Sequence, residues 1–575
     1  MFSDTEIRQL HLGIPSVRRN WLGLLDSAGL TCDQEPDYAL GLYDACDRLV
    51  GCAALCGNII KGVAIDEQAR GTAAANKLIT GVRDEGIRRG HDNLFIFTKP
   101  EYAATFGSLA FHQIASGPGV VLLESGRRAL SSYCAYLSSL PRGKRNGVIV
   151  MNANPLTRGH LYLIEHAAAM VDALTIIPLA ENEHNSFSYA ERRGALLEAT
   201  ACMPNVTVAE GSPYCISAST FPSYFIKSVD ERTDAHIGLD LNLFVNHIAP
   251  ALGATVRFVG TEPTDRLTAR YNELMAETLP AHGIEVKQVE RLAGNDGIPF
   301  SASRVRGEMA DGALGKALSV AADASMPLLL GHAAADALRA ELALTPKPGL
   351  VDRENNGAHK DMDFALMSRS IDAIQPYFVR MARAAAGDAL PCAGVLQPIG
   401  IKAEKAMFEA THGVNTHRGA IFSMGLMVSA AAWLLSGGKE LSARSLCETV
   451  GAIARSFAAP ERTHGSLVAA EYGIPTAVDM ACSGYAPLFG NWLGEHDLHR
   501  RLLLIISQLE DSNLYYRGGR EGVAFAREKV SAALASSLDN ALLRKLDAEF
   551  TARNLSPGGA ADMLALSVFI DKLLN

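Results

Sequence analysis

Apolar positions in the first 125 residues recur in a pattern typical of a sheet packed against helices. The run from Gly57 to Ile65 is apolar and rich in β-branched residues, which predicts a strand. Residues 73–89 carry apolar side chains at helical spacing, and the short apolar runs at 94–97 and 120–123 predict two more strands. This region is therefore predicted to have an α/β fold.

The pattern from residue 145 to about 310 alternates strand and helix more regularly. A helix is predicted over 161–171, between apolar strands at 147–151 and 174–179, and later strands are predicted at 256–260 and 285–289. Such alternation predicts a parallel, Rossmann-like sheet with crossover helices. Sheets of this kind bind ligands at the carboxyl ends of their strands.

The pattern changes again between Gly312 and Pro327. Alanine and leucine dominate from there on, at helical spacing, which predicts an all-α domain over 326–575. The most apolar run, Met424 to Leu435, is too short to span a bilayer and is predicted to be a buried helix of a soluble protein. The chain is thus predicted to be multidomain, with domains at 1–130, 145–325 and 326–575.

Composition narrows the class of protein. The 575 residues are 48% apolar and 20% charged, with a net charge of -9, which argues against a nucleic-acid partner because phosphate binding usually needs a basic face. The ten cysteines are scattered, and the one close pair, Cys52 and Cys56, lacks a second pair to complete a zinc site. With no apolar targeting segment at the N-terminus, we expect a cytoplasmic protein without a membrane partner.

A candidate phosphate-binding loop follows the predicted strand at 147–151. Pro155 holds Asn154 out of helix geometry, and Gly159 allows a ligand to approach the backbone closely. The helix that starts near His160 presents free N–H groups and the positive end of its dipole to phosphate. Thr157 and His160 are expected to point at that phosphate.

A second element lies about 140 residues later, in the sequence FSASRVR. Ser303 and Arg306 are three residues apart and so share one helix face, and Ser301 precedes them. Hydroxyl and guanidinium groups at the start of a helix suit the outer phosphates of a nucleotide. The end of the predicted strand at 256–260 offers further lining for a nucleotide pocket, with a purely structural turn as the alternative: Gly260, Thr261 and Glu262.

These two elements, in this order, resemble the paired signatures of the HIGH nucleotidyltransferase superfamily. The stretches GVIVMNANPLTRGHLYLIEHAA, YCISASTFPSYFIKS, RFVGTEPTDRLTARYNE and PFSASRVR, with GNIIKGVAI and FIFTKPEY before them, closely resemble the citrate lyase ligase family over residues 1–310. The resemblance implies that acetate attacks the α-phosphorus of ATP. The acetyl-adenylate then acylates the prosthetic-group thiol on the acyl carrier subunit of citrate lyase.

The resemblance also implies roles for the residues of both elements. His160 would act at the α-phosphate, and Mg²⁺ would bridge phosphate oxygens. Asn154 and Gly159 would contact the nucleotide. The triphosphate would be held by Thr157, Ser301, Ser303 and Arg306.

The segment Gln68 to Ala73 lies between a predicted strand and a predicted helix. It resembles the pyrophosphate loop of acetyltransferases, in which backbone N–H groups receive phosphate, and so implies a GNAT-like first domain. Two interpretations stay open: the domain binds a phosphopantetheine-like arm, or it is a degenerate scaffold.

The C-terminal domain opens with a loop rich in proline, glycine and charged residues. Carboxylates and an imidazole gather here, and oxygen-rich clusters suit Mg²⁺ bound to a triphosphate. Lys347 adds positive charge opposite phosphate. The predicted metal ligands are Asp352, His359, Asp361, Asp363 and, much later in the chain, Asp511.

Two more loops complete the predicted C-terminal site. Gly413 to Gly419 opens an apolar helix and supplies His417 and Arg418, and LEDSN at 509–513 precedes Arg517. The set TPKPGLVD, GAHKDMDF, NTHRGAIF and the late DSN…RGG resembles the triphosphoribosyl-dephospho-CoA synthase family over 326–575. The resemblance implies transfer of the triphosphoribosyl part of ATP to the ribose 2′-hydroxyl of dephospho-CoA, with Asp352 and Asp361 as candidates for the catalytic base.

One segment departs from the synthase pattern. Val478 and Met480 stand where that family has an arginine and a glutamate, and Arg418 replaces a lysine. A C-terminal half that is inactive or only docks the lyase therefore stays open as an alternative. Two more alternatives stay open on other grounds: a different adenylyltransferase (pantetheine or nicotinate mononucleotide), which the central signatures alone would allow, and service to malonate decarboxylase, which shares the prosthetic group.

Overall fold

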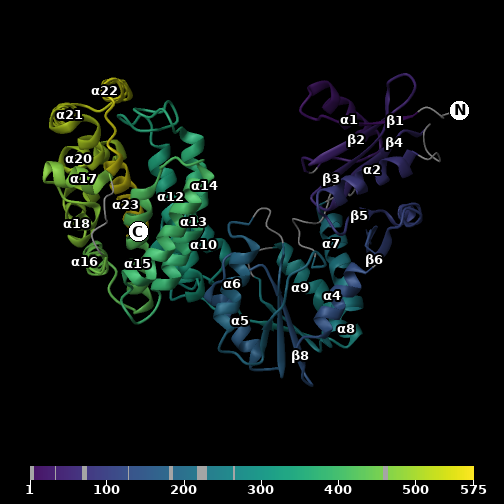
Figure 1. Cartoon of the computed structure of the whole chain (residues 1–575). Coiled ribbons are helices and arrows are strands. Elements are labelled where there is room, and N and C mark those ends of the chain that lie inside the picture. Colours follow the sequence, from purple (N-terminus) through teal and green to yellow (C-terminus); the bar gives the residue numbers. More distant parts are fainter. Residues whose placement is uncertain are drawn as a thin grey trace. The chain divides into compact units, whose positions relative to one another are not determined.

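The computed structural model describes residues 5–32, 34–67, 74–126, 128–180, 185–215, 229–262, 266–457 and 464–575. The chain divides into two compact units (Figure 1). The first comprises Met1–Asn154 and Arg158–Pro299, and the second comprises Pro155–Thr157 and Phe300–Asn575.

The first unit begins with a seven-stranded sheet in the order β1-β2-β3-β4-β5-β7-β6. All neighbouring strands are antiparallel except β4 and β5, which are parallel and pair only at Ile59 with Phe95 and Ile60 with Ile96. The strands are β1 (Glu6–Gln9), β2 (Tyr38–Tyr43), β3 (Leu49–Cys56), β4 (Ile59–Ile65), β5 (Phe95–Thr98), β6 (His112–Gly117) and β7 (Val120–Glu124).

Helices cover this sheet because each has one apolar stripe. In α2, the buried residues Leu78, Ile79 and Val82 share such a stripe and pack with apolar side chains of the strands. The helices of this part are α1 (Pro15–Ser27), α2 (Ala74–Arg88), α3 (Ala103–Gly107) and α4 (Ala129–Ser138).

A second, five-stranded sheet follows in the order β10-β9-β8-β11-β12, and all its pairings are parallel. Its strands are β8 (Asn146–Met151), β9 (Ala173–Pro178), β10 (Val206–Val208), β11 (Val256–Gly260) and β12 (Glu285–Val289). Its helical segments are α5 (Arg158–Ala168), α6 (Tyr189–Thr200), α7 (Val229–Leu243), a π-helical turn (Phe244–Ile248), α8 (Ala249–Leu252) and α9 (Arg266–Thr278).

The described part of the second unit from Phe300 onward is built from helices, coloured green to yellow in Figure 1. The longest stretches of its core are alanine- and leucine-rich faces of α12, α15 and α23. The helices are α10 (Ala302–Ala310), α11 (Leu314–Val320), α12 (Met326–Ala343), α13 (Phe364–Ala385), α14 (Ala393–Ala410), α15 (Arg418–Ser436), α16 (Ala443–Ala454), α17 (His464–Tyr472), α18 (Ala477–Cys482), α19 (Asn491–Gly494), α20 (Leu498–Gln508), α21 (Ser512–Leu534), α22 (Asn540–Ala552) and α23 (Gly558–Leu574).

The predicted fold classes are confirmed: a mixed α/β sheet, then a parallel α/β sheet, then an all-α region. Helix α5 begins at Arg158, earlier than predicted. The chain before it is fixed by Leu156, whose carbonyl accepts hydrogen bonds from Ala322 N at 3.1 Å and Ser325 Oγ at 2.9 Å, so the helix starts directly after this anchor. Among the described helices, α15 alone is long and apolar enough to cross a membrane, but 72% of its apolar window is buried within the protein.

Close packing of α12 on α13 predicts a stability effect at Gly331. A Cβ there would lie 2.4 Å from Val379 Cγ2 and 2.7 Å from Val379 N, so the helices must separate. We expect Gly331→Ala to lower the free energy of unfolding of the helical unit by about 1–3 kcal/mol, although alanine favours helices. Calorimetry should show this loss against the control Gly400→Ala in α14, where the nearest atom, Met381 Cε, is at 3.7 Å. Equal melting temperatures for the two variants would contradict the packing.

Candidate active sites

The order of strands in the parallel sheet marks the position of a ligand site. From β8 the chain moves outward to β9 and β10, and then returns to the other side of β8 for β11 and β12. The direction of winding therefore reverses beside β8, and ligands bind in the crevice at the carboxyl ends of the strands at such a point. The loop that carries Asn154, and the helix start that carries His160, follow β8 at this edge.

A buried arginine that the sequence analysis did not single out organises this loop. Arg192 on α6 is fully buried, and its Nη1 donates to the carbonyl of Asn152 at 2.8 Å, to Asn152 Oδ1 at 2.6 Å and to the carbonyl of Leu179 at 3.0 Å. Its Nε donates to the carbonyl of Phe187 at 3.1 Å. One guanidinium thus joins the ends of β8 and β9, and the sequence gives no signal for it because three of its four contacts are with backbone carbonyls.

Asn154 also helps to hold the loop. Its Oδ1 accepts a hydrogen bond from Phe187 N at 3.2 Å, and its Nδ2 donates to Asn185 Oδ1 at 2.7 Å. The Asn154 side chain is buried, so the described contacts position the backbone that leads to the helix. The predicted contact of Asn154 with ATP stays a prediction, as does that of Gly159.

His160 lies in the first turn of α5 and is partly exposed. Burial, together with the positive charge of Arg291, lowers its pKa to about 4. The imidazole is therefore neutral at pH 7, so it is available there for hydrogen bonding and carries no positive charge.

Arg291 follows β12 and was missed by the sequence analysis. Its Nε donates to the carbonyl of Thr261 at 2.7 Å, and its guanidinium pairs with Glu262. Gly260 lies close to this arginine, since a Cβ on Gly260 would be 3.9 Å from Arg291 Cγ. An arginine that follows the neighbouring strand β12 thus holds the turn after β11 that was predicted to line the pocket. The sequence alone does not show that β12 lies beside β11, so this arginine could not be identified from it.

The second predicted nucleotide element belongs to the second unit. Ser301 caps α10 by accepting a hydrogen bond from Arg304 N at 3.2 Å, and Ser303 Oγ accepts one from Arg306 Nη2 at 3.3 Å, as their shared helix face predicts. Thr157 is fully buried and forms a β-bridge with Ala321. Because His160 lies in the first unit, a joint triphosphate site of these residues stays a prediction.

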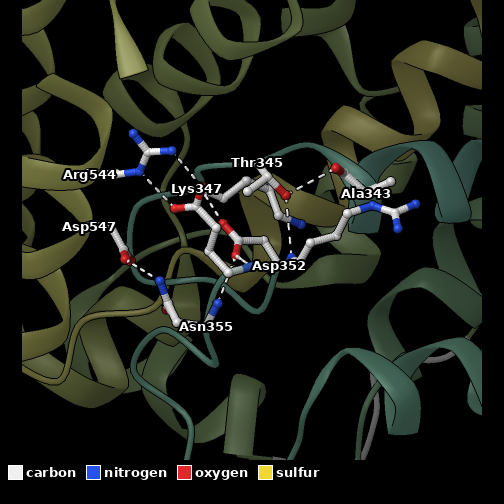
Figure 2. Close-up of polar contacts among 9 residues, drawn as sticks. Ala343, Thr345, Lys347, Asp352, Asn355, Arg544 and Asp547 are labelled. Atoms are coloured by element: carbon white, nitrogen blue, oxygen red, sulfur yellow. Dashed lines mark hydrogen bonds and ion pairs between the residues drawn. The ribbon is translucent and has the colours of Figure 1, made fainter. Parts of the chain in front are cut away.

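The proline-rich loop at the start of the helical domain folds around Asp352 (Figure 2). This carboxylate is buried, its Oδ2 accepts from Lys347 N at 2.9 Å, and its Oδ1 accepts from Glu354 N at 2.7 Å and Asn355 N at 3.1 Å. Asp352 was predicted to be a catalytic base and a metal ligand. In the structure, the hydrogen bonds described for its carboxylate are all accepted from backbone N–H groups of the loop.

Asp547 on α22 fixes the same loop from the other side (Figure 2). Its Oδ1 accepts from Gly349 N at 2.9 Å, and its Oδ2 accepts from Asn355 Nδ2 at 2.8 Å. Burial raises the pKa of Asp547. Gly349 adopts φ +70°, and a Cβ there would lie 2.2 Å from the carbonyl oxygen of Leu555, so this position requires glycine.

Lys347 is almost fully buried and forms an ion pair with Glu341 of α12, with 2.5 Å between Nζ and Oε1. Glu341 was missed because it lies inside a helix, before the loop motif. The predicted phosphate-binding charge of Lys347 is therefore paired with the carboxylate of Glu341.

The predicted metal ligands do not meet in one place. Both ring nitrogens of His359 are engaged, Nε2 with Ser556 Oγ at 2.8 Å and Nδ1 with Arg517 at 3.2 Å, and burial lowers its pKa to about 4. Asp363 caps α13, Asp511 caps α21, and Asp361 is exposed. Within the described ranges, no group of three or more His, Cys, Asp or Glu side chains is arranged to hold a metal ion.

His417 and Arg418 begin α15. The Nδ1 of His417 is 2.8 Å from Ser370 Oγ, and burial, with the charge of Lys347, lowers the pKa of the ring to about 4. Its Nε2 is buried and has no hydrogen-bond partner among the described residues. Arg418 forms an exposed ion pair with Glu404, with 3.2 Å between Nε and Oε2.

Comparisons with known proteins identify both parts of the chain. Residues 146–326 match the family model for the citrate lyase ligase C-terminal domain, and residues 327–575 match the model for ATP:dephospho-CoA triphosphoribosyl transferase. The chain is 43% identical over 267 residues to the [citrate [pro-3S]-lyase] ligase of Escherichia coli, covering 45% of this chain and 75% of the relative.

A second relative is the 2-(5''-triphosphoribosyl)-3'-dephosphocoenzyme-A synthase of Pectobacterium atrosepticum, with 41% identity over 256 residues, covering 40% of this chain and 85% of that protein. The chain belongs to both the citrate lyase ligase family and the triphosphoribosyl-dephospho-CoA synthase family. It is an enzyme that joins a ligase to a triphosphoribosyl transferase. Among solved structures, a putative acyl-CoA N-acyltransferase from Klebsiella pneumoniae is 20% identical, with TM-score 0.19, and covers 21% of this chain and 95% of its own.

Parts of the ligase family motifs lie outside the described residues. These are the loop from Gln68 to Ala73, most of the stretch from Tyr214 to Ser228, and Pro263 to Asp265. The proposal of a pyrophosphate loop in the first domain therefore stays a prediction.

The contacts of Asp352 predict that this residue stabilises the loop, and the free energy of unfolding of a variant tests this. We expect Asp352→Asn to lower the free energy of unfolding of the helical unit by about 1–3 kcal/mol, because an amide replaces a buried carboxylate that accepts three backbone N–H groups. The matched variant Asp361→Asn, at an exposed position of the same loop, should unfold as the wild type does. Denaturant unfolding checks both, and equal midpoints would show that Asp352 does not organise the loop.

Proposed function

We propose that this enzyme matures citrate lyase through two ATP-dependent reactions. The ligase half joins acetate to the prosthetic-group thiol on the acyl carrier subunit of citrate lyase, with AMP and pyrophosphate as products. The synthase half makes 2'-(5''-triphosphoribosyl)-3'-dephospho-CoA from ATP and dephospho-CoA and releases adenine. The observation that carries this proposal is that two family matches, to a ligase and to a synthase, adjoin at residues 326 and 327 of one chain.

In the ligase reaction an acetate oxygen attacks the α-phosphorus of ATP, and the bond to pyrophosphate breaks. The thiolate then attacks the acetyl carbonyl, and AMP leaves. The protein needs no covalent step of its own, so positioning and charge stabilisation account for catalysis. His160, neutral at pH 7, donates a hydrogen bond to the α-phosphate, while Gly260, Thr261 and Glu262, held by Arg291, line the nucleotide pocket.

In the synthase reaction the 2′-hydroxyl of dephospho-CoA attacks C1′ of the ATP ribose. The glycosidic bond to adenine breaks, and the transition state resembles a ribosyl oxocarbenium ion. His417, Arg418 and Arg517 are proposed to contact ATP. Of these, His417 is supported by its buried Nε2, which lacks a partner among the described residues and is positioned at the start of α15.

We propose that Mg²⁺ accompanies ATP into both sites and neutralises phosphate charge when bound. Mg²⁺ commonly uses one or two protein carboxylates together with substrate phosphates. The predicted ligand set does not form a protein cage among the described residues, since Asp352, Asp363 and Asp511 each accept backbone N–H groups. Asp361, which is exposed, is the member of the set best placed to meet such a metal.

The partners proposed are small molecules, acetate and dephospho-CoA, and one protein, the acyl carrier subunit. We place both reactions in the cytoplasm, in keeping with the bacterial relatives. Two alternatives remain as outcomes of the test below: a helical half that has lost activity through Val478 and Met480, and a central domain that adenylylates a different acceptor.

Wild-type protein with Mg²⁺, ATP and dephospho-CoA should release adenine at a rate that depends on dephospho-CoA. With Mg²⁺, ATP, acetate and the thiol form of citrate lyase, it should form AMP and pyrophosphate at a rate that depends on acetate. Chromatography of adenine and AMP measures both products from one preparation. AMP without adenine would leave a ligase that carries a silent helical half, and AMP formed on a phosphate acceptor without acetate would favour the other adenylyltransferase.

A further inference from the structure

Asp562 is a carboxylate of the helical unit that no sequence motif singled out. It lies in the second turn of α23, is partly exposed, and accepts no hydrogen bond from any described residue. Its Oδ2 lies directly against the start of α15, because a Cβ on Gly419 would be 2.1 Å from that oxygen. The NTHRG motif therefore ends in a glycine that leaves room for the Asp562 carboxylate.

Asp511 places the start of α23. It is buried, caps α21 by accepting from Asn513 N at 2.8 Å, and accepts from Ala560 N at 3.0 Å across to α23. A Cβ on Gly559 would lie 3.0 Å from Asp511 Oδ2, so this junction is tight. Asp511 of the late DSN motif thus helps to position Asp562, because it accepts a hydrogen bond from the backbone of Ala560, two residues before Asp562.

Tyr485 supplies a second, independent sign of a ligand. Its side chain is 2% exposed, and its hydroxyl has no hydrogen-bond partner among the described residues. Burial, and then the charge of Asp562, raise the pKa of this phenol, so the two groups are within electrostatic reach of each other. Tyr485 also adopts φ +53°, a strained conformation for a residue with a side chain, and such strain is common at functional sites.

The altered segment of the synthase motif leads to this tyrosine. Thr476 and Asp479 form a capping box that starts α18, and the helix ends at Cys482, just before Gly484 and Tyr485. Val478 and Met480 therefore lie on a short, well-capped helix whose end presents Tyr485. The two altered positions thus precede Tyr485 and leave this tyrosine in place.

We propose that Asp562 is the catalytic base of the synthase half, with Tyr485 and His417 completing a pocket that binds the reacting ribose. Resting on the proposed synthase function, this assigns the base to Asp562 in place of Asp352, whose carboxylate is occupied by backbone N–H groups. The nearby carboxylates of Glu341 and Asp511, after burial itself, raise the pKa of Asp562 well above its ordinary value. A raised pKa makes a carboxylate a stronger proton acceptor in the fraction of molecules in which it is ionised.

The oxygen of the acceptor hydroxyl forms a bond to C1′ of the ATP ribose, and its proton passes to Asp562. The bond between C1′ and N9 breaks, and its electron pair leaves with adenine, which takes a proton from solvent. Asp562 then returns its proton to water.

The test measures adenine release by full-length variants with Mg²⁺, ATP and dephospho-CoA. Asp562→Asn should lower kcat about 100-fold or more, since a general base contributes on that scale. The matched control Asp539→Asn, at the exposed N-cap of α22, keeps its capping geometry and should retain full activity. Tyr485→Phe should lower the rate about tenfold without lowering the melting temperature, because the hydroxyl has no described partner to lose.

Gly419→Ala keeps the proposal testable if Asp562→Asn folds poorly. Alanine favours the helix but displaces the carboxylate, so adenine release should fall at least tenfold with no loss of stability. In Asp562→Asn the same change should lower adenine release no further, because the carboxylate that it would displace has already been replaced by an amide.

Activity of Asp562→Asn within threefold of wild type overturns the proposal. Additive losses for Asp562→Asn and Gly419→Ala would also overturn it. A wild-type protein that releases no adenine would instead remove the synthase function itself, so the two failures are distinguishable.

Discussion

The active-site loops of this enzyme depend on one constraint: the backbone polar groups of a buried loop must find hydrogen-bond partners. In the parallel sheet, Arg192 meets this demand by donating to the carbonyls of Asn152, Leu179 and Phe187. In the helical unit the buried charges are negative instead of positive. The carboxylates of Asp352 and Asp547 accept hydrogen bonds from N–H groups of the loop that follows α12. A buried charge is stable in these places because backbone dipoles surround it.

The polar residues near the sites are therefore of two kinds. Some hold the loops that shape a site, and others keep a polar atom available to a ligand. Asp352 and Asp511 belong to the first kind, since their described bonds are made to backbone. Asp562, Tyr485 and His417 belong to the second kind, because each retains a polar atom without a described partner. A conspicuous acidic motif therefore need not contain the carboxylate that meets the substrate.

Much of the fold followed from the sequence because periodicity reports directly on local structure. The predicted strands at 256–260 and 285–289 coincide with β11 and β12, and the apolar run at 424–435 lies within α15. The edge strand β1 was not predicted because it has only four residues, most of them exposed. Arg291 and Asp562 were not predicted for a different reason: each joins its site through strand order or helix packing, which spacing along the chain does not reveal. Glu341 was not predicted because it lies inside α12, before the loop motif that contains its partner Lys347.

The two halves share ATP and serve one cofactor pathway, yet attachment of the prosthetic group separates their reactions. Tethering would raise effective concentration only if an intermediate passed directly between them. Production of both activities in a fixed ratio is a sufficient reason for the fusion. On this view each half works with its own ATP site and its own catalytic groups.

The most direct test of that claim is to measure AMP and adenine side by side in a His160→Asn variant, supplied with all substrates of both reactions. The account predicts that AMP formation falls about 100-fold, as expected for loss of a group that stabilises transition-state charge, while adenine release stays at the wild-type rate. A parallel fall of both products, or unchanged AMP formation, would contradict it.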